Sequence, residues 1–201
     1  MGHGPEQSGA CVLNLKEWNN AAESYENVLE VYPEFRPAYE RARSLEHDVL
    51  FNYQRAFMLN ESWLQRNPDD LAAIASLAET YFTTGDFDEC ARRISSLLAD
   101  NRFDEKTKSS LRALEIANLI ALSRSAEVPA RVKDLIETIE SRGIDFRVQS
   151  SFAGIEHFIR QSKLSPAQQA WLLQFFAAMS RENRDAIVKE LKAVAASFTP
   201  N

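Results

Sequence analysis

The sequence predicts an all-α fold built from repeated helical hairpins, and three observations predict it. Apolar residues recur every three or four positions along nearly the whole chain, which is the period of an amphipathic helix, and no alternating strand pattern bounded by turns is found. Six glycines and seven prolines among 201 residues leave few turns for a β protein. A segment of about 34 residues recurs near the N-terminus. These patterns divide the chain into about eleven helices.

The repeat is a pattern of side-chain size. An aromatic residue, a small residue and a large apolar residue keep the same spacing in three copies, which are Trp18-Ala21-Val28, Tyr53-Ala56-Trp63 and Phe87-Cys90-Leu97. A further helix precedes the third copy and presents one apolar face made of Ile74, Leu77, Ala78 and Tyr81. Each unit is therefore predicted to be a hairpin of two helices.

This pattern resembles the tetratricopeptide repeat. Residues 69–102 match well, including the Gly85-Asp86-Phe87 turn, and residues 2–35 match through Trp18, Ala21, Tyr25, Val28 and Pro33. On the first helix of that unit, Gly9 falls on the small site, where a bulky side chain would cost about 1–3 kcal/mol by overpacking. The resemblance implies a right-handed α-solenoid of tetratricopeptide-like hairpins that ends in a C-terminal capping helix.

The expected organisation has three parts. Residues 1–103 hold three hairpins, residues 104–182 hold degenerate hairpins, and residues 183–201 form the capping helix. The second hairpin is the weakest match, and one long helix over residues 38–66 competes with two helices. Asn52, which can cap a helix, and Tyr53, which keeps the repeat register, favour two. Ser165-Pro166 with Gln168 predicts a capped helix start in the second part.

The charge distribution excludes several kinds of partner. Net charge is −6, and the excess of acidic residues lies within the first 70 residues. Nucleic acid and anionic membranes require a basic patch and are not expected as partners. No run of about 18 apolar residues exists for a membrane span. The two cysteines, Cys11 and Cys90, are far apart in helical contexts, which predicts a protein of a reducing compartment such as the cytoplasm.

The residues that usually carry catalysis are not arranged for it. His3, His47 and His157 are widely separated and lack metal-ligand spacing, so we expect His47 on the solvated surface and His157 packed on a helix. Cys90 occupies a small, buried repeat position, which disfavours a reactive thiolate. No phosphate loop, nucleophile elbow or Cys-x-x-Cys motif is present. We therefore expect no enzyme activity, cofactor or metal.

The remaining candidate site is the concave groove that the first helices of stacked hairpins form. When the repeat positions are assigned to this geometry, the residues predicted to face the groove and bind a partner are Arg41, Ser76, Glu79, Phe82 and Thr83. Small residues leave room for a ligand, and an exposed Phe82 could anchor it. Tetratricopeptide proteins that grip the carboxylate tails of heat-shock chaperones resemble one another in a Lys and Asn clamp. The matching positions here hold Glu6, Ala10, Ala72 and Ser76, so that role is not expected.

The predicted function is a non-catalytic scaffold or adaptor that binds a peptide or protein segment in this groove. This is an argument from the resemblance, because a fold by itself does not determine function. An alternative is that the chain is the assembly or regulatory region of a larger enzyme or secretion complex. A third hypothesis is homo-oligomerisation through the exposed ends of the solenoid.

Overall fold

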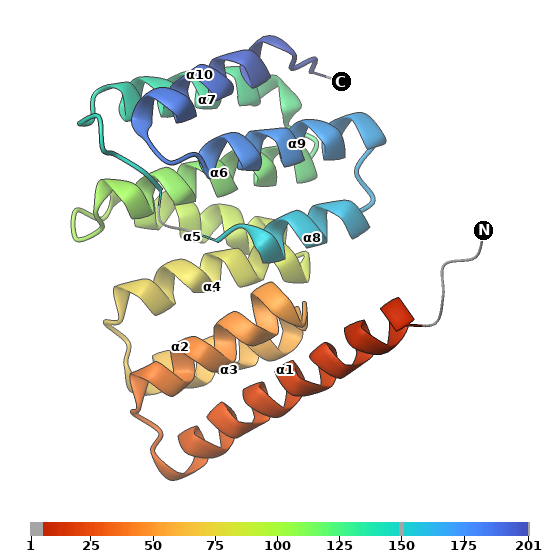
Figure 1. The fold of residues 1–201 in the computed structure, drawn as a ribbon. Helices are drawn as coiled ribbons and strands as arrows, with labels where there is room; N and C mark the ends of the chain where they lie inside the picture. The colour runs from red at the N-terminus through yellow and green to blue at the C-terminus, as the bar shows by residue number, and fades with distance from the viewer. Residues whose placement is uncertain (1–5, 149–150, 201) are drawn as a thin grey trace. The chain divides into compact units, whose positions relative to one another are not determined.

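A computed structural model describes residues 6–148 and 151–200, with side chains from Asn14 onward. These residues form ten α-helices and no strand (Figure 1). The helices are α1 (Glu6–Val31), α2 (Arg36–Ser44), α3 (Tyr53–Arg66), α4 (Leu71–Thr84), α5 (Phe87–Ala99), α6 (Glu105–Ala121), α7 (Val128–Glu140), α8 (Ala153–Gln161), α9 (Pro166–Met179) and α10 (Arg184–Ala196). A π-helical turn covers Leu45–Val49 and a 3₁₀ turn covers Ser125–Glu127. The chain divides into two units, residues 1–74 and 75–201.

The first unit departs from the predicted hairpin pattern in α1. The hairpin predicted for residues 2–35 needs a break between its two helices, which the sequence pattern places at Lys16-Glu17. This prediction is wrong, because α1 runs without interruption from Glu6 to Val31. Residues 15–18 contain neither glycine nor proline, and nothing in this segment opposes helix continuation. The repeat pattern also assigned Trp18 to the packing of paired helices, whereas this side chain is 46% exposed. The side chains of Glu6, Gly9, Ala10 and Cys11 and the whole of His3 lie outside the described residues.

The segment 38–66 forms two helices, which settles the alternative left open by the sequence. A π-helical turn follows α2, and Phe51 then adopts a left-handed conformation with φ 56°. The amide of Leu50 donates to the Leu45 carbonyl, and the amide of Asn52 donates to the Glu46 carbonyl. Asn52 precedes α3 as predicted, but its side chain makes no capping hydrogen bond. The chain therefore turns here without glycine or proline.

The turn between α4 and α5 is built as the repeat pattern predicts. Gly85 has φ 86°, and the amides of Gly85 and Asp86 donate to the carbonyls of Phe82 and Tyr81. This bonding pattern ends α4, and glycine adopts the required φ without steric cost. Asp86 then caps α5 by accepting a hydrogen bond from the Glu89 amide at 3.2 Å. The Gly-Asp pair thus stops one helix and starts the next.

The second unit buries a core shared by its paired helices. Helix α6 packs against α5 and α7, and α10 packs against α7 and α9 (Figure 1). Trp171 of α9 donates its indole N–H to the Val194 carbonyl of α10 at 2.9 Å. The predicted capping box is confirmed, because Ser165 accepts from the Gln168 amide and the Gln168 side chain accepts from the Ser165 amide. The last helix, where the sequence predicts a capping helix, buries Ile187, Leu191 and Val194 on one face.

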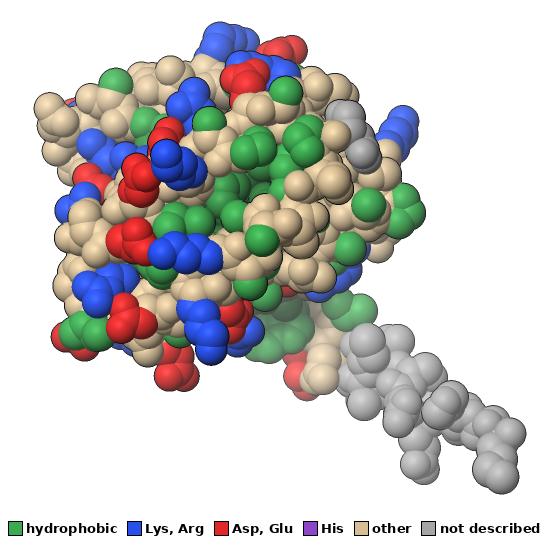
Figure 2. All heavy atoms as spheres, turned by 90° about the horizontal axis from the view of Figure 1, so that it is seen from above, with side chains coloured by type: hydrophobic (Ala, Val, Ile, Leu, Met, Phe, Trp, Pro, Cys, Tyr) green, Lys and Arg blue, Asp and Glu red, His purple; other side chains and the backbone are tan. Residues whose placement is uncertain are grey.

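The charged side chains of this unit lie in mixed pairs. Figure 2 shows one face of it, on which lysines and arginines lie next to aspartates and glutamates. Two such pairs are Arg181 with Glu190, at 2.7 Å, and Lys192 with Glu140, at 2.5 Å. Among the described residues, no helix is both long and apolar enough to span a bilayer. The right-handed superhelix and the three-part organisation remain predictions.

Candidate functional site

The predicted groove residues differ in their accessibility. Arg41 of α2 is exposed, and Ser76 and Glu79 of α4 are partly buried. Arg41 belongs to the first unit and the other two to the second. A groove that combines them remains a prediction.

Phe82 does not have the exposed position expected for an anchor. Its side chain is fully buried, and its ring lies 5.6 Å from that of Phe87 and 5.3 Å from that of Phe158, measured between centroids. Thr83 is buried as well, with 3% exposure. The prediction that Phe82 and Thr83 line the groove assumed that the last turn of α4 is exposed to solvent. The Phe158 ring of α8, about 75 positions further along the chain, fills that space instead.

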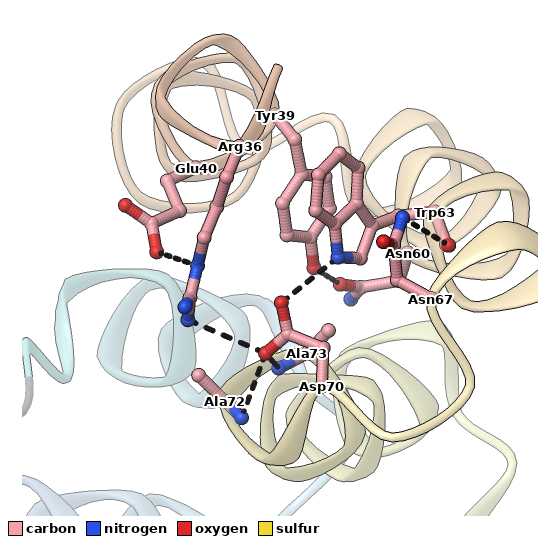
Figure 3. Close-up of polar contacts among 9 residues, drawn as sticks. All are labelled: Arg36, Tyr39, Glu40, Asn60, Trp63, Asn67, Asp70, Ala72 and Ala73. Atoms are coloured by element: carbon pink, nitrogen blue, oxygen red, sulfur yellow. Dashed lines mark hydrogen bonds and ion pairs between the residues drawn. The ribbon is translucent and has the colours of Figure 1, made fainter. Parts of the chain in front are cut away.

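The first unit is held together by an aromatic stack between α2 and α3 (Figure 3). The rings of Tyr39 and Trp63 lie 4.5 Å apart and within 5° of parallel. The Tyr39 hydroxyl donates to the Asn60 side-chain oxygen, which is fully buried. Leu29 of α1 and Leu64 pack against this cluster. Trp63 is thus fixed at a predicted repeat position.

Asp70 connects this stack to the start of α4 (Figure 3). One carboxylate oxygen accepts the indole N–H of Trp63 at 3.0 Å. The other accepts the amides of Ala72 and Ala73, at 3.1 and 3.2 Å, and a hydrogen bond from Arg36 at 3.3 Å. Arg36 also pairs with Glu40 at 2.8 Å. The carboxylate therefore caps α4 and fixes the Trp63 ring at the same time.

A pocket of about 320 Å³ lies beside this stack, between α1 and α3. The Tyr39 and Trp63 side chains line it together with Leu29 of α1, Met58 of α3 and Pro33, which follows α1. Polar groups at the same pocket are Glu26 and Arg55, which form an ion pair whose Nε–Oε1 distance is 3.0 Å. The pocket can accept an apolar side chain, with a charged pair beside it.

A second apolar surface adjoins this pocket where α1 ends. It is lined by Val28, Val31, Tyr32, Pro33, Glu34, Phe35 and Arg66. Val31, Tyr32 and Phe35 are among the most exposed large apolar side chains, at 67%, 66% and 50%. Sequence reasoning missed this surface because it assigned Pro33 only to the end of a repeat. The apolar residues on both sides of Pro33, in an otherwise polar turn, were the available signal.

Two buried ionisable groups of the first unit, Glu46 and His47, lie in the π-helical turn. His47 is 1% exposed, so the expected surface position is wrong. Its Nδ1 lies 2.9 Å from Asp48, and its ring contacts Tyr53 edge-on. Burial, with a smaller effect of Asp48, raises the pKa of Tyr53 to about 12. These contacts fix the turn between α2 and α3.

The thiol and metal chemistry of the described residues is limited. Cys90 is fully buried, and burial together with Asp86 and Glu79 raises the pKa of its thiol. A neutral, inaccessible thiol is a poor nucleophile. No cluster of three or more His, Cys, Asp or Glu side chains suited to a metal ion occurs among the residues that the structure describes.

Consecutive helical hairpins with small residues at their contacts define a helical-repeat protein. Residues 51–114 match the family model of the tetratricopeptide repeat, and this segment runs from α3 through most of α6. Residues 51–114 therefore form a helical repeat of the tetratricopeptide type. No curated protein and no solved structure matched the chain significantly. Tetratricopeptide repeats generally mediate protein–protein interactions and are typically non-catalytic.

Proposed function

We propose that this chain is a non-catalytic adaptor whose first unit binds a segment of another protein. One observation supports this most strongly. Of eight exposed large apolar side chains among the described residues, seven lie in residues 1–74: Leu15, Trp18, Tyr25, Val31, Tyr32, Phe35 and Met58. The eighth, Ile144, lies in the second unit. Apolar surface gathered in one unit is typical of an interaction site.

The pocket between α1 and α3 supplies a seat for one anchoring side chain. Its aromatic wall is held rigid, because the Tyr39–Trp63 stack is itself buried and hydrogen-bonded. A rigid pocket loses little conformational entropy when a ligand enters, which favours binding. The exposed Met58 at the same pocket has a flexible side chain that can adapt to the anchor.

The test is affinity capture from a native lysate with matched surface variants. Met58→Asp and Tyr32→Ala alter the proposed surface, whereas Ile144→Asp places the same kind of change on the second unit. A partner retained by wild type and the Ile144 variant, and lost by the other two, is the expected result. If every partner is retained equally by all four proteins, the first unit does not carry the binding surface.

The concave groove remains the second proposed location, now limited to Arg41, Ser76 and Glu79. Arg41→Glu tests it in the same capture, because this exposed side chain takes no part in the Tyr39–Trp63 cluster. Loss of the partner in this variant alone would favour the groove over the pocket.

A further inference from the structure

Helix α1 leaves four side chains more exposed than their counterparts in the next two repeats. These are Trp18, Ala21, Tyr25 and Val28, called here the α1 stripe. They lie three and four residues apart and therefore share one face of the helix. Trp18 is 46% exposed and Tyr25 is 36% exposed.

The equivalent side chains in the next two repeats are more deeply covered. At the position of Trp18, Tyr53 and Phe87 are partly buried, and the side chains at the other three positions are buried. On α3, at a spacing of 35 residues, Ala56, Asn60 and Trp63 are buried; on α5, at a further 34, Cys90, Ile94 and Leu97 are buried. On α3 the covering helix is α2, whose Tyr39 stacks on Trp63 and donates to Asn60. In a complete first repeat, the helix preceding Trp18 would cover the α1 stripe in the same way. The uninterrupted course of α1 from Glu6 prevents that arrangement.

The net negative charge of the segment that carries the stripe indicates which helix would fit. Residues 14–35 contain one lysine and five glutamates. Of these, Glu26 pairs with Arg55, and Glu34 lines the apolar surface at the end of α1. An incoming amphipathic helix with a basic polar face would be attracted to this segment, and one with an acidic polar face would be repelled.

We propose that the α1 stripe docks one basic amphipathic helix of a partner protein, in the position that the first helix of a hairpin holds in a complete repeat. The proposal rests on the proposed function, since both require a protein partner, but it assigns a surface other than the pocket between α1 and α3, and a helical occupant. The chain's own α2–α3 pair indicates the contact: an aromatic side chain of the incoming helix packs on Val28, the counterpart of Trp63.

A matched pair of peptides provides the probe. Both carry residues 69–85 of this chain, whose Ile74, Leu77, Ala78 and Tyr81 form one apolar face. In the basic peptide, Ala72→Lys, Ala75→Lys and Glu79→Lys change the opposite face. In the acidic peptide, Ala72→Glu and Ala75→Glu do so, and Glu79 is retained. Fluorescence anisotropy of the labelled peptides measures their binding to the full chain at low salt.

The basic peptide should bind at least about tenfold more tightly than the acidic one. Trp18→Ala with Tyr25→Ala should weaken it by at least about tenfold, whereas Met58→Asp should leave it within about twofold. Circular dichroism verifies that each variant is folded. Loss of binding in Met58→Asp alone would place the peptide in the pocket, which overturns the stripe proposal and leaves the proposed function standing.

Two other results would also overturn the proposal. One is the absence of wild-type binding for either peptide up to about 1 mM. The other is a wild-type dimer in light scattering that becomes monomeric in the Trp18 and Tyr25 variant, because the occupant of the stripe would then be a second copy of this chain. The affinity capture with Met58→Asp tests the pocket between α1 and α3. Its outcome is therefore independent of these two results.

Discussion

The Tyr39 ring lies flat on the indole of Trp63, with ring centroids 4.5 Å apart and planes within 5° of parallel. The two side chains come from the two helices of one hairpin, α2 and α3. Offset stacking of this kind contributes about 0.5–1.5 kcal/mol beyond the apolar area that it buries. The pair therefore sets the contact of the two helices and also forms a wall of the pocket beside α1.

Tyr39→Phe should keep the stack and remove one hydrogen bond. Asn60 is fully buried and accepts from the Tyr39 hydroxyl, so losing that donor should lower the free energy of unfolding by about 1–3 kcal/mol. Urea denaturation monitored by circular dichroism measures this. Tyr25→Phe, on the exposed stripe, is the control and should change stability by less than about 0.5 kcal/mol. Equal effects of the two changes would show that the Tyr39 hydroxyl contributes nothing.

Asp70→Ala should destabilise the first unit more than the exposed ion pair alone would suggest. It removes the cap of α4 and the acceptor of the Trp63 indole, together worth about 2–3 kcal/mol. Arg36 is about half exposed, and its pairing with Asp70 adds little. Glu40→Ala breaks only the exposed pair with Arg36 and should cost less than about 0.5 kcal/mol. Thermal unfolding of both variants measures the contrast.

The Glu46→Gln variant should become more stable relative to wild type as pH rises. Burial, and next the negative charge of Glu26, raise the pKa of Glu46 above 4.5 in the folded state. The folded chain therefore binds the Glu46 carboxyl proton more tightly than the unfolded chain does. The contribution of Glu46 to the free energy of unfolding is fully present below its pKa in the unfolded chain. It is lost as pH rises through its pKa in the folded chain.

Urea unfolding of wild type and the Glu46 variant from pH 4 to pH 7 measures the effect. The stability of the variant minus that of wild type should increase across this range, and the value near pH 4 is the internal reference. A difference that is constant or falls with pH would show that ionisation of Glu46 does not oppose folding.

Ser123→Gly should stabilise the second unit. Ser123 has φ 59° at the end of α6, and the amides of Ser123 and Arg124 donate to the carbonyls of Ile120 and Leu119. Glycine relieves the left-handed strain, for a net gain of about 0.5–1 kcal/mol in the free energy of unfolding. Gly85→Ala, at φ 86°, is the reverse change and should destabilise by about 1 kcal/mol. Calorimetry on both variants would contradict this explanation if the two changes had the same sign.

Much of the fold followed from the sequence because side-chain size and turn chemistry act locally. Ala56, Cys90 and Leu97 are buried at the positions that the repeat spacing predicted. Gly85-Asp86 and Ser165-Pro166 start and stop helices by hydrogen bonds to neighbours within six residues, which a sequence displays directly. Where the signal was local, the prediction was correct.

The errors arose where distant contacts or missing turn signals decided the structure. Phe82 is buried by Phe158, which no local pattern relates to it. The hairpin expected at Lys16-Glu17 had no glycine, proline or cap to form a turn, and α1 stays helical there. Conversely, the turn at Phe51 forms without such residues through a π-helical turn. The candidate surface on α1 therefore could not be found by periodicity, which had assigned its residues to the core.

The contact between Phe82 and Phe158 also limits how this protein can be shortened. A fragment ending near residue 103 would retain three repeats by sequence and lose α8 with its Phe158 ring. Two phenylalanines, Phe82 and Phe87, would then face water, and such a fragment would tend to aggregate. Proteolytic trimming or recombinant dissection of the repeat region should therefore extend at least through Gln161.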